Sequence, residues 1–550
     1  MPKSIDNQRS RAQESTAAIE RIYITMRHLL IRGFYKPMGV SGKTLRESLL
    51  TLRPEIYGSI AESKVELNGL LYVIERLPFG IEECRFINLT SDEGYKNSHF
   101  KAIIPKKRRR NCYRIDDEQI NIEITRGRSD IYDILTHLTF LYIESQKIMK
   151  RIMIGEDKKF SRDWEKLQLA VKNKTLNEND KEVAIIHTAN ILGRTFKEIN
   201  AVYDKFSSEN DPDRFLKLIS FLGKLALDEN IKNNKRVITF SPVLREGLGH
   251  HIHGEQWANA IKSTLEKHGL LDRKIHIISA NMHSVMNTLY AKKALKLFCK
   301  GKTDLEIFEA LSKTENEKHR QKVEQYALQN GMFLIKDTSG TNIDVQLFDL
   351  SINSKKSDAP ILLVMDYAFG EQAYETIDEL LKPHLLTSDT LHYLNIESIS
   401  IMGKAGILEG GKGDIMIPKA HLFEGTADNY PFDNALDKED FEGHGLNVFS
   451  GTMVTVLGTS LQNRELLKFF HDSSWNVIGL EMEGAHYQKA IQAASKLRGN
   501  IKKDITVRYA YYASDNPLET GATLASGGLG TSGVKPTYLI TRKILEQIFN

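Results

Sequence analysis

Cysteine is scarce in this chain of 550 residues, which holds only three of them, Cys84, Cys112 and Cys299. Their odd number and wide spacing exclude a disulfide framework and a paired-cysteine metal site, and they favour a reducing compartment. Long apolar runs are also missing. Ile361–Met365, among the longest, is far too short to cross a bilayer, and the opening segment MPKSIDNQRSRAQEST has no apolar signal core. We therefore expect a cytoplasmic protein with no membrane partner.

The chain also lacks an excess of either charge. It contains 75 Lys and Arg against 71 Asp and Glu, and the net charge of +4 is too small to require a polyanionic partner. The densest basic run, Lys106–Arg110, is soon followed by Asp116, Asp117 and Glu118. We interpret this run as a solvated loop and do not expect a nucleic-acid partner. RNA binding through the run remains an alternative.

Apolar residues are plentiful enough, at 41% of the chain, to build the cores of two or three domains. From about residue 15 to 230 they recur at intervals of three and four, as in Ile131, Ile134, Leu135 and Leu138, which indicates amphipathic helices. The polar stretch Lys232–Arg236 ends this pattern, and short β-rich runs alternating with helices follow. We therefore predict a helical N-terminal domain of unknown role over residues 1–235 and an α/β domain over residues 236–550.

Several β-rich runs in the second part are continuously apolar, as expected for strands that are buried on both faces. This pattern, with helical segments between the runs, predicts an α/β fold with a mixed, mainly parallel sheet flanked by helices. The predicted strands are Val237–Phe240, Ile275–Ala280, Ile361–Met365, Ser398–Met402, Asp414–Ile417, Leu446–Phe449, Val477–Leu480 and Ile505–Tyr512.

Glycines and acids follow four of these predicted strands. Ligands of α/β sheets lie beyond the carboxyl ends of the strands, so residues at these positions are candidates for a site. We expect them to gather at one edge of the sheet. The four segments are Asp366–Glu371 (DYAFGE), Gly403–Gly406 (GKAG), Glu481–Gly484 (EMEG) and Ala513–Pro517 (ASDNP).

These segments, in this order, resemble the nucleoside phosphorylase and nucleosidase superfamily. Its members carry a Gly-x-[Ala/Cys]-Gly turn, then a Glu-Met-Glu strand end, then a Ser-Asp strand end. GDIMIP (Gly413–Pro418) and NVFSGTMVTV (Asn447–Val456) are similar to two further strands of the family, and SDNPLETG (Ser514–Gly521) looks closest to AMP nucleosidases. The resemblance covers about residues 272 to 550. It implies a nucleoside phosphorylase-like fold, a homo-oligomer, and a small nucleoside or nucleotide as the substrate.

The implied reaction is cleavage of the N-glycosidic bond of a purine nucleoside or nucleotide. Such a reaction builds positive charge on the sugar and pushes electrons into the base, so the site must protonate the base and hold the sugar. Asp515 is the candidate acid for the leaving purine, and Glu483 matches the family carboxylate that binds the ribose hydroxyls. We expect both carboxyl groups to face one pocket, lined also by Glu481, Met482 and Ser514. The alternatives are helix capping by Asp515 and a helix-dipole role for Glu483.

Further substrate contacts are expected from the glycines Gly370, Gly403 and Gly406, which let the backbone approach a ligand, and from Lys404, Met453, Val454 and His283. Phosphorylases of the superfamily usually carry an Arg and a Ser or Thr where this chain has Ile401 and Lys404. This departure favours hydrolysis, although Lys404 could hold a phosphate as a point charge.

The residue that activates water is left open between His283 and Glu371. Phosphorolysis is the leading alternative reaction, and a catalytically inactive nucleotide-sensing protein is an alternative of another class.

No cofactor or metal is expected. The histidines of GLGHHIHG, His250, His251 and His253, lack the helical spacing of a metal pair, and we interpret them as a polar turn or a substrate-contacting loop. The glycine-rich segment Gly521–Gly533 is either a lid that excludes water or a plain flexible loop.

Overall fold

The computed structural model shows an α/β protein of two compact units. It describes residues 2–550 except 155–158, 174–175, 209–210, 353–357, 387, 427 and 520–528, with side chains described from residue 10 onward. Unit 1 comprises Met1–Thr125, Asp130–Leu248 and Ser460–Asn463, and unit 2 comprises Arg126–Ser129, Gly249–Thr459 and Arg464–Asn550. Each unit thus contains one four-residue segment that is flanked in sequence by residues of the other unit. These segments are Ser460–Asn463 in unit 1 and Arg126–Ser129 in unit 2.

Hydrogen bonds hold each of these short segments in its unit. In unit 2 the backbone N–H of Glu371 donates to Ser129 Oγ at 2.9 Å. In unit 1 the N–H of Glu55 donates to the carbonyl oxygen of Gln462 at 2.8 Å.

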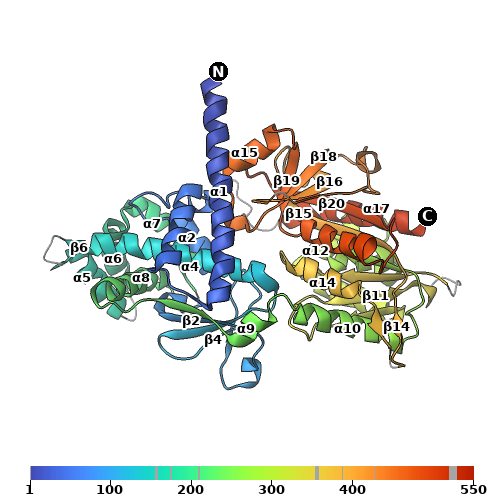
Figure 1. Cartoon of the computed structure of the whole chain (residues 1–550), viewed down its shortest axis with the longest axis horizontal. Coiled ribbons are helices and arrows are strands. Elements are labelled where there is room, and N and C mark those ends of the chain that lie inside the picture. Colours follow the sequence, from blue (N-terminus) through green and yellow to red (C-terminus); the bar gives the residue numbers. More distant parts are fainter. Residues whose placement is uncertain are drawn as a thin grey trace. The chain divides into compact units, whose positions relative to one another are not determined.

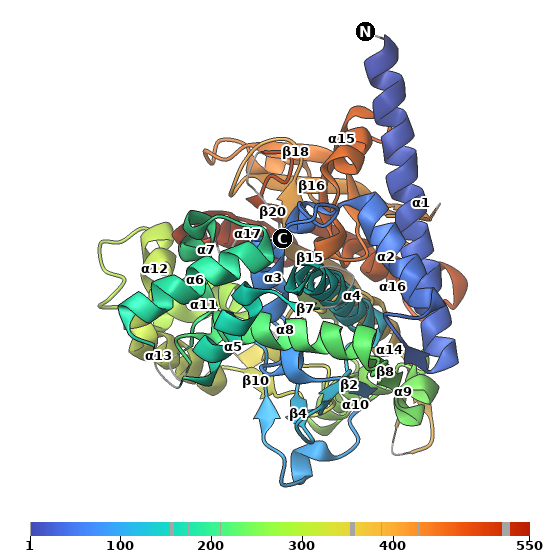
Figure 2. The ribbon, with the colours of Figure 1, turned by 90° about the vertical axis from the view of Figure 1, so that its left-hand side faces the viewer.

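Helices dominate unit 1, which also contains a six-stranded sheet. Their ends carry ordinary capping signals: the Thr195 side chain and Glu198 form a capping box at the start of α7, and Gly193 ends α6 in the left-handed conformation. Figure 2 shows α5, α6 and α8 side by side. The helices are α1 (Pro2–Arg32), α2 (Val40–Leu52), α3 (Leu67–Ile74), α4 (Gly127–Ile152), α5 (Arg162–Lys172), α6 (Glu178–Leu192), α7 (Phe196–Tyr203), α8 (Arg214–Ile231) and α9 (Pro242–Gly247).

The sheet of unit 1 was not predicted from the sequence. Its order is β1-β8-β2-β5-β4-β3, and its strands are too short to show a two-residue period clearly. Val237–Phe240, predicted for the C-terminal sheet, is β8 of this sheet and lies between β1 and β2. The predicted boundary after residue 235 therefore falls inside unit 1. The strands are β1 (Phe34–Tyr35), β2 (Phe86–Thr90), β3 (Ala102–Ile103), β4 (Cys112–Arg114), β5 (Gln119–Glu123) and β8 (Val237–Phe240), and β6 (Met153–Ile154) pairs with β7 (Lys159–Phe160) as a separate hairpin.

The basic run is only partly the solvated loop that we predicted. Arg110 is 3% exposed, and its Nη2 lies 2.7 Å from Asp130 Oδ1 and 2.5 Å from Asp133 Oδ2. Arg108 Nε also pairs with Asp133, at 3.0 Å. Acids on α4, distant in sequence, therefore hold these two arginines. Because their charge is already compensated, the alternative of RNA binding through this run loses support.

Unit 2 is built on a ten-stranded sheet of order β10-β11-β12-β9-β15-β19-β18-β16-β17, with β20 paired to β15 and β16. The predicted strands from Ile275 onward are present, whereas β10, β11 and β17 were missed. The strands are β9 (Ile275–Ser279), β10 (Met332–Ile335), β11 (Val345–Asp349), β12 (Ile361–Met365), β15 (Ile396–Ile407), β16 (Ile415–Phe423), β17 (Asn429–Pro431), β18 (Val448–Thr455), β19 (Val477–Glu481) and β20 (Thr506–Asp515), with β13 (His384–Leu385) and β14 (Leu391–His392) as a separate hairpin.

Helices cover both faces of this sheet, which explains the continuous apolar runs. Within β12, Ile361, Leu363 and Met365 enter a core with α10, α14 and α16, whereas Leu362 and Val364 enter another with α11, α12, α13 and α17. Figure 1 shows α10, α12, α14 and α17 around the strands. The helices are α10 (Ile252–Lys267), α11 (Met282–Ala294), α12 (Asp304–Ser312), α13 (Glu317–Gln329), α14 (Gln372–Leu380), α15 (Arg464–Asp472), α16 (Gly484–Gln492) and α17 (Val534–Phe549).

Helices that could span a membrane are absent from the described part of the chain, because none combines the necessary length with the necessary hydropathy.

Candidate active site

Two groups of parallel strands meet in the sheet of unit 2. The strands β12, β9, β15 and β20 run parallel to one another, and β16, β18 and β19 form a second parallel group. The groups join where β15 and β19 pair antiparallel, with Gly406 opposite Leu480 and Ile407 opposite Gly479. The carboxyl ends of β15 and β19 therefore pass one another at this junction, and such strand ends are where α/β proteins bind ligands.

The GKAG segment lies inside a strand at this junction, so the prediction of a turn was wrong. β15 continues through Gly403–Gly406 to Ile407, and neither glycine takes the left-handed backbone conformation. Gly403 is needed for space, because a Cβ there would lie 2.9 Å from the Tyr511 ring. At Gly406 the pairing with β20 shifts register, so that Gly406 faces Asp515. The glycines allow close packing of neighbouring strands.

Asp515, the predicted acid, is the last residue of β20 and is 1% exposed. Its Oδ1 lies 2.5 Å from Ser514 Oγ, which also lies 3.0 Å from the carbonyl oxygen of Ala405. Its Oδ2 is buried and has no hydrogen-bond partner among the described residues. Burial raises the pKa of Asp515, opposed by the Ser514 hydrogen bond and by the charges of Lys404 and Lys412. Burial thus shifts the pKa of this carboxyl group upward, and one of its oxygens is unpaired among the described residues.

Glu481, at the end of β19, holds the start of α16. Its Oε1 accepts a hydrogen bond from Thr455 Oγ1 at 2.5 Å, and its Oε2 accepts the backbone N–H groups of Glu483, at 2.5 Å, and Gly484. Burial raises the pKa of Glu481 to about 7 against the effect of these bonds. With both oxygens engaged, Glu481 supports the strand-to-helix turn that carries Glu483.

Glu483 stands directly before α16, where the backbone and a neighbouring loop hold its carboxyl group. Its Oε1 accepts the N–H of Gly370 at 2.9 Å, and its Oε2 accepts the N–H of Met482 at 3.3 Å. Desolvation, and then the nearby Glu481, raise the pKa of Glu483 to about 8. Gly370 was expected to let the backbone approach a ligand. It adopts a φ of +57° and uses its backbone N–H to position Glu483.

Tyrosines that the sequence analysis did not single out surround Glu483. The Tyr367 hydroxyl is buried and has no hydrogen-bond partner among the described residues, and the charge of Glu483 is one of the causes that raise its pKa, after burial. The Tyr487 hydroxyl lies 2.9 Å from Ser279 Oγ, and the Tyr511 hydroxyl lies 3.1 Å from His421 Nε2. Tyr487 follows Glu483 by one helical turn, a spacing that could have indicated it. Tyr367 lies in the Asp366–Glu371 segment, which was selected as a candidate for the site, but the tyrosine itself was not named.

The raised pKa of Glu483 predicts how the free energy of unfolding varies with pH. Its pKa is about 8 in the folded chain against an ordinary value of 4.5, so between these values the folded state keeps a proton that the unfolded state releases. This group therefore lowers the free energy of unfolding as pH rises from 4.5 to 8, by at most about 1.4 kcal/mol per pH unit. Below pH 4.5 its destabilising effect disappears.

Urea denaturation from pH 5 to pH 8 tests this expectation. Because glutamine stays neutral, the stability of the Glu483→Gln variant relative to the native chain should increase as the pH rises. The matched control is Glu409→Gln, which changes an exposed carboxylate just beyond β15. A stability difference for Glu483→Gln that does not vary over this pH range would contradict the assignment.

The remaining predicted residues lie in different environments. Met453, Val454 and Met482 are buried in apolar clusters of the core. Lys404 and His283, both exposed, line a cavity of about 420 Å³. His283 remains a candidate for activating water, whereas the other candidate, Glu371, is paired with Arg128 at 3.1 Å.

Asp515 and Glu483 lie on opposite sides of β15. Asp515 pairs with Gly406 from one side, and Leu480, which precedes the Glu483 turn, pairs with Gly406 from the other. Two strand spacings correspond to roughly 10 Å between the flanking backbones. Among the described residues no hydrogen bond or ion pair joins the two carboxyl groups directly. Of the glycine-rich segment Gly521–Gly533, residues 521–528 lie outside the described part of the chain.

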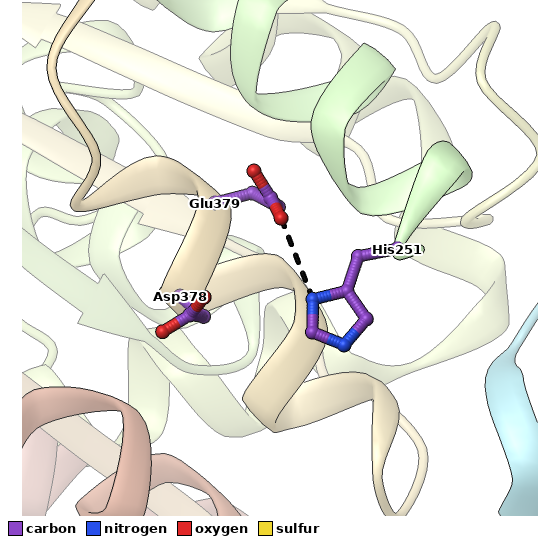
Figure 3. A group of neighbouring side chains, drawn as sticks. All are labelled: His251, Asp378 and Glu379. Atoms are coloured by element: carbon purple, nitrogen blue, oxygen red, sulfur yellow. Dashed lines mark ion pairs between the residues drawn. The ribbon is translucent and has the colours of Figure 1, made fainter. Parts of the chain in front are cut away.

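His251 belongs to a charged cluster. Figure 3 shows it facing Glu379 of α14, with 3.4 Å between His251 Nδ1 and Glu379 Oε1. Potential metal ligand atoms of His251, Asp378 and Glu379 lie within 4.8 Å of one another. Arg498 already pairs with Asp378 at 2.6 Å, and Lys382 pairs with Glu379 at 2.6 Å. A divalent cation would have to compete with both of these charges, so we treat the group as an ion-pair network.

A family model matches residues 43–298 and 304–550, which is most of the chain. The chain belongs to DUF6909, a family of unknown function. No curated protein matches this DUF6909 chain.

Parts of the DUF6909 chain are also similar to solved structures of nucleosidases. The 5′-methylthioadenosine/S-adenosylhomocysteine nucleosidase of Campylobacter jejuni shares 12% identity and a TM-score of 0.31, with 50% of this chain and 97% of that chain covered. Futalosine hydrolase of Helicobacter pylori shares 12% identity and a TM-score of 0.32, with coverage of 50% and 98%. A 5′-methylthioadenosine/S-adenosylhomocysteine nucleosidase of Colwellia psychrerythraea in complex with adenine shares 12% identity and a TM-score of 0.27, with coverage of 49% and 96%.

Proposed function

We propose that unit 2 is a nucleosidase of nucleoside phosphorylase-like fold, which hydrolyses the N-glycosidic bond of a small purine nucleoside or nucleotide. The observation that carries the proposal is the pair of desolvated carboxyl groups, Asp515 and Glu483, on the two sides of β15. Both have raised pKa values. Asp515 is the last residue of β20, and Glu483 lies between the end of β19 and the start of α16. The order of the GKAG, EMEG and ASDNP segments along the chain supports the same function.

Asp515 is the proton donor in this proposal. As the bond between the sugar and the base breaks, electrons move into the purine, and a proton delivered to the ring makes the base a better leaving group. A carboxyl group does this well when it is protonated near neutral pH, and burial moves the pKa of Asp515 in that direction. The Oδ2 atom, which has no partner among the described residues, is free to carry the transferred proton.

Glu483 binds the sugar in this proposal. Ribose hydroxyl groups that donate to its carboxylate stabilise the ionised form and so lower its raised pKa when substrate binds. The negative charge then stabilises the positive charge that develops on the sugar in the transition state. The backbone N–H of Gly370 and the cap formed by Glu481 keep this carboxyl group in place before substrate arrives.

Hydrolysis is the preferred reaction because Ile401 occupies the position at which phosphorylases of the superfamily usually carry an arginine. Ile401 is 2% exposed, inside the apolar core of the sheet, and offers nothing to an anion. The exposed His283, in the first turn of α11, is the proposed base for the attacking water.

The deciding experiment is chromatographic analysis of the full chain incubated with a mixed pool of purine nucleosides and nucleotides in phosphate-free buffer. We expect a free base together with ribose or ribose 5-phosphate. Sugar 1-phosphate, formed only after phosphate is added, would replace hydrolysis with phosphorolysis. Thermal stabilisation by members of the pool without any release of base would refute the enzyme and favour a nucleotide sensor.

A further inference from the structure

The segment Arg126–Ser129 belongs to unit 2, although unit 1 precedes and follows it in sequence. Two of its side chains contact the residues that lead into α14. The guanidinium carbon of Arg126 lies 4.7 Å from the centre of the Phe369 ring, and Arg128 Nη1 lies 3.1 Å from Glu371 Oε1. The segment therefore packs on the loop between β12 and α14.

Ser129 supplies a cap for α14 from this distant part of the sequence. The N–H groups at the amino end of a helix have no partner within it and need acceptors from elsewhere. Glu371 is the N-cap residue of α14, and among the described residues its own side chain does not cap the helix. Its backbone N–H instead donates to Ser129 Oγ at 2.9 Å, and Ser129 is only 6% exposed.

The N–H that precedes this one in the chain belongs to Gly370 and donates to Glu483 Oε1 at 2.9 Å. Two consecutive N–H groups therefore have separate acceptors, Ser129 for the second and the proposed sugar-binding carboxyl group for the first. Ser129 also packs directly on Gly370, because a Cβ at Gly370 would collide with Ser129 Oγ. The position of Gly370 thus depends on Ser129 through both a shared turn and a close contact.

We propose that Ser129, with the support of Arg128, is a positioning residue that holds the Gly370–Glu371 turn so that Glu483 stays in place to bind the sugar. The role of Glu483 toward the sugar rests on the proposed function, whereas the hold on Glu483 belongs to the folded chain and requires no turnover. Without the serine hydroxyl group, the N–H of Glu371 needs another acceptor, and the carboxyl group of Glu483 is the one bonded to the neighbouring N–H. Movement of Glu483 toward that donor takes it away from the sugar, and a misplacement of about 1 Å is costly to the rate.

A double-mutant cycle between Ser129 and Glu483 tests the hold directly. Urea denaturation at pH 9 is suitable, because the pKa of Glu483 is about 8 and its buried carboxylate then relies on the N–H of Gly370. We expect Ser129→Ala to lower the denaturation midpoint more in the native background than in the Glu483→Gln background, although the two side chains form no described contact with each other. In the control background Glu409→Gln, Ser129→Ala should lower the midpoint as much as in the native background.

The kinetic readout is the pH profile of kcat/KM for ribonucleosides. Ser129→Ala should lower kcat/KM at least about tenfold. It should also move the acid limb to higher pH, because a weaker hydrogen bond from Gly370 raises the pKa of Glu483 further. The matched control is Ser473→Ala, which removes an acceptor of a backbone N–H, that of Trp475 at 3.3 Å, before the opposite end of β19. This control should keep the native profile.

Arg128 provides a second set of variants, which serves if Ser129→Ala does not fold. Its side chain is 35% exposed, so its replacement should be tolerated. Arg128→Met should shift the acid limb in the same direction but less, and Arg128→Lys should restore the native profile because it keeps the charge beside Glu371. The matched control is Arg542→Met, which breaks an exposed ion pair with Glu546 on α17.

The outcomes separate this inference from the proposed function. Additive midpoint shifts in the cycle overturn the inference, and so do pH profiles of Ser129→Ala and Arg128→Met that coincide with the native profile. A non-additive cycle in a chain that releases no base would refute only the proposed function. Native kcat/KM in Ser129→Ala together with an additive cycle would refute only the positioning role.

Discussion

Replacing Asp515 with asparagine is expected to slow the release of the purine base by at least about 100-fold, because an amide cannot deliver the proton that the leaving base needs. The substitution keeps the shape of the side chain, and the asparagine oxygen can still accept from Ser514 Oγ, the neighbour of Oδ1 at 2.5 Å. It also removes the cost of burying an ionisable group, so folding should be preserved. The rate of base release under saturating substrate, followed by chromatography, measures the effect.

The matched control is Asp504→Asn. Asp504 is exposed and lies just before the first residue of β20, whereas Asp515 is the last residue of that strand. This variant should release base at the native rate. Thermal melts of both variants establish that they are folded. Native turnover in Asp515→Asn would remove the aspartate from the mechanism. Equal losses in both variants would show that the effect is not specific to the site.

Replacing Glu483 with glutamine is expected to lower kcat/KM for ribonucleosides by at least about 100-fold. The amide is neutral and cannot stabilise the positive charge that develops on the sugar as the bond breaks. The glutamine oxygen can still accept the N–H of Gly370, which donates to Glu483 Oε1 at 2.9 Å, so the local backbone should remain in place. Steady-state kinetics on the best nucleoside of the pool provide the measurement.

A comparison of ribose with 2′-deoxyribose substrates separates binding of the sugar from a general loss of activity. The native chain should prefer the ribose form, and Glu483→Gln should lose most of that preference, because the missing hydroxyl group no longer costs a charge-assisted hydrogen bond. Glu409→Gln should retain the preference. If the variant discriminates as strongly as the native chain, Glu483 does not bind the sugar hydroxyls.

Much of unit 2 could be predicted from the sequence, because its strands are buried on both faces and therefore appear in the sequence as continuous apolar runs. Ile361–Met365 was predicted with its observed bounds, and its residues enter alternate cores. The GKAG segment misled us because glycine suggests a turn, whereas Gly403 accommodates the ring of Tyr511, more than one hundred residues away in sequence. Close packing between strands that are distant in sequence produces no local sequence pattern, so it could not be predicted.

The sheet of unit 1 and the setting of the site were harder to predict. Strands such as Phe34–Tyr35 are too short to show a period, and the burial of Arg110 depends on acids of α4 that no spacing rule links to it. In the candidate site, the sequence indicated Asp515 and Glu483 as acids. It did not indicate that Gly370 would hold Glu483, or that Arg320 of α13 would line a cavity with Lys404. Such contacts depend on how separate elements pack.

Each unit includes a short segment that lies elsewhere in the sequence, and this limits how the chain can be divided into separately expressed fragments. A fragment that begins after Leu248 would lack Ser129, which anchors the backbone of Glu371 next to the Gly370–Glu483 contact. A fragment that ends there would lack Gln462, the acceptor for Glu55. Each truncation product would therefore be missing one of its own anchors. Recovering either half by recombinant expression would require grafting the absent tetrapeptide or supplying the complementary polypeptide in trans.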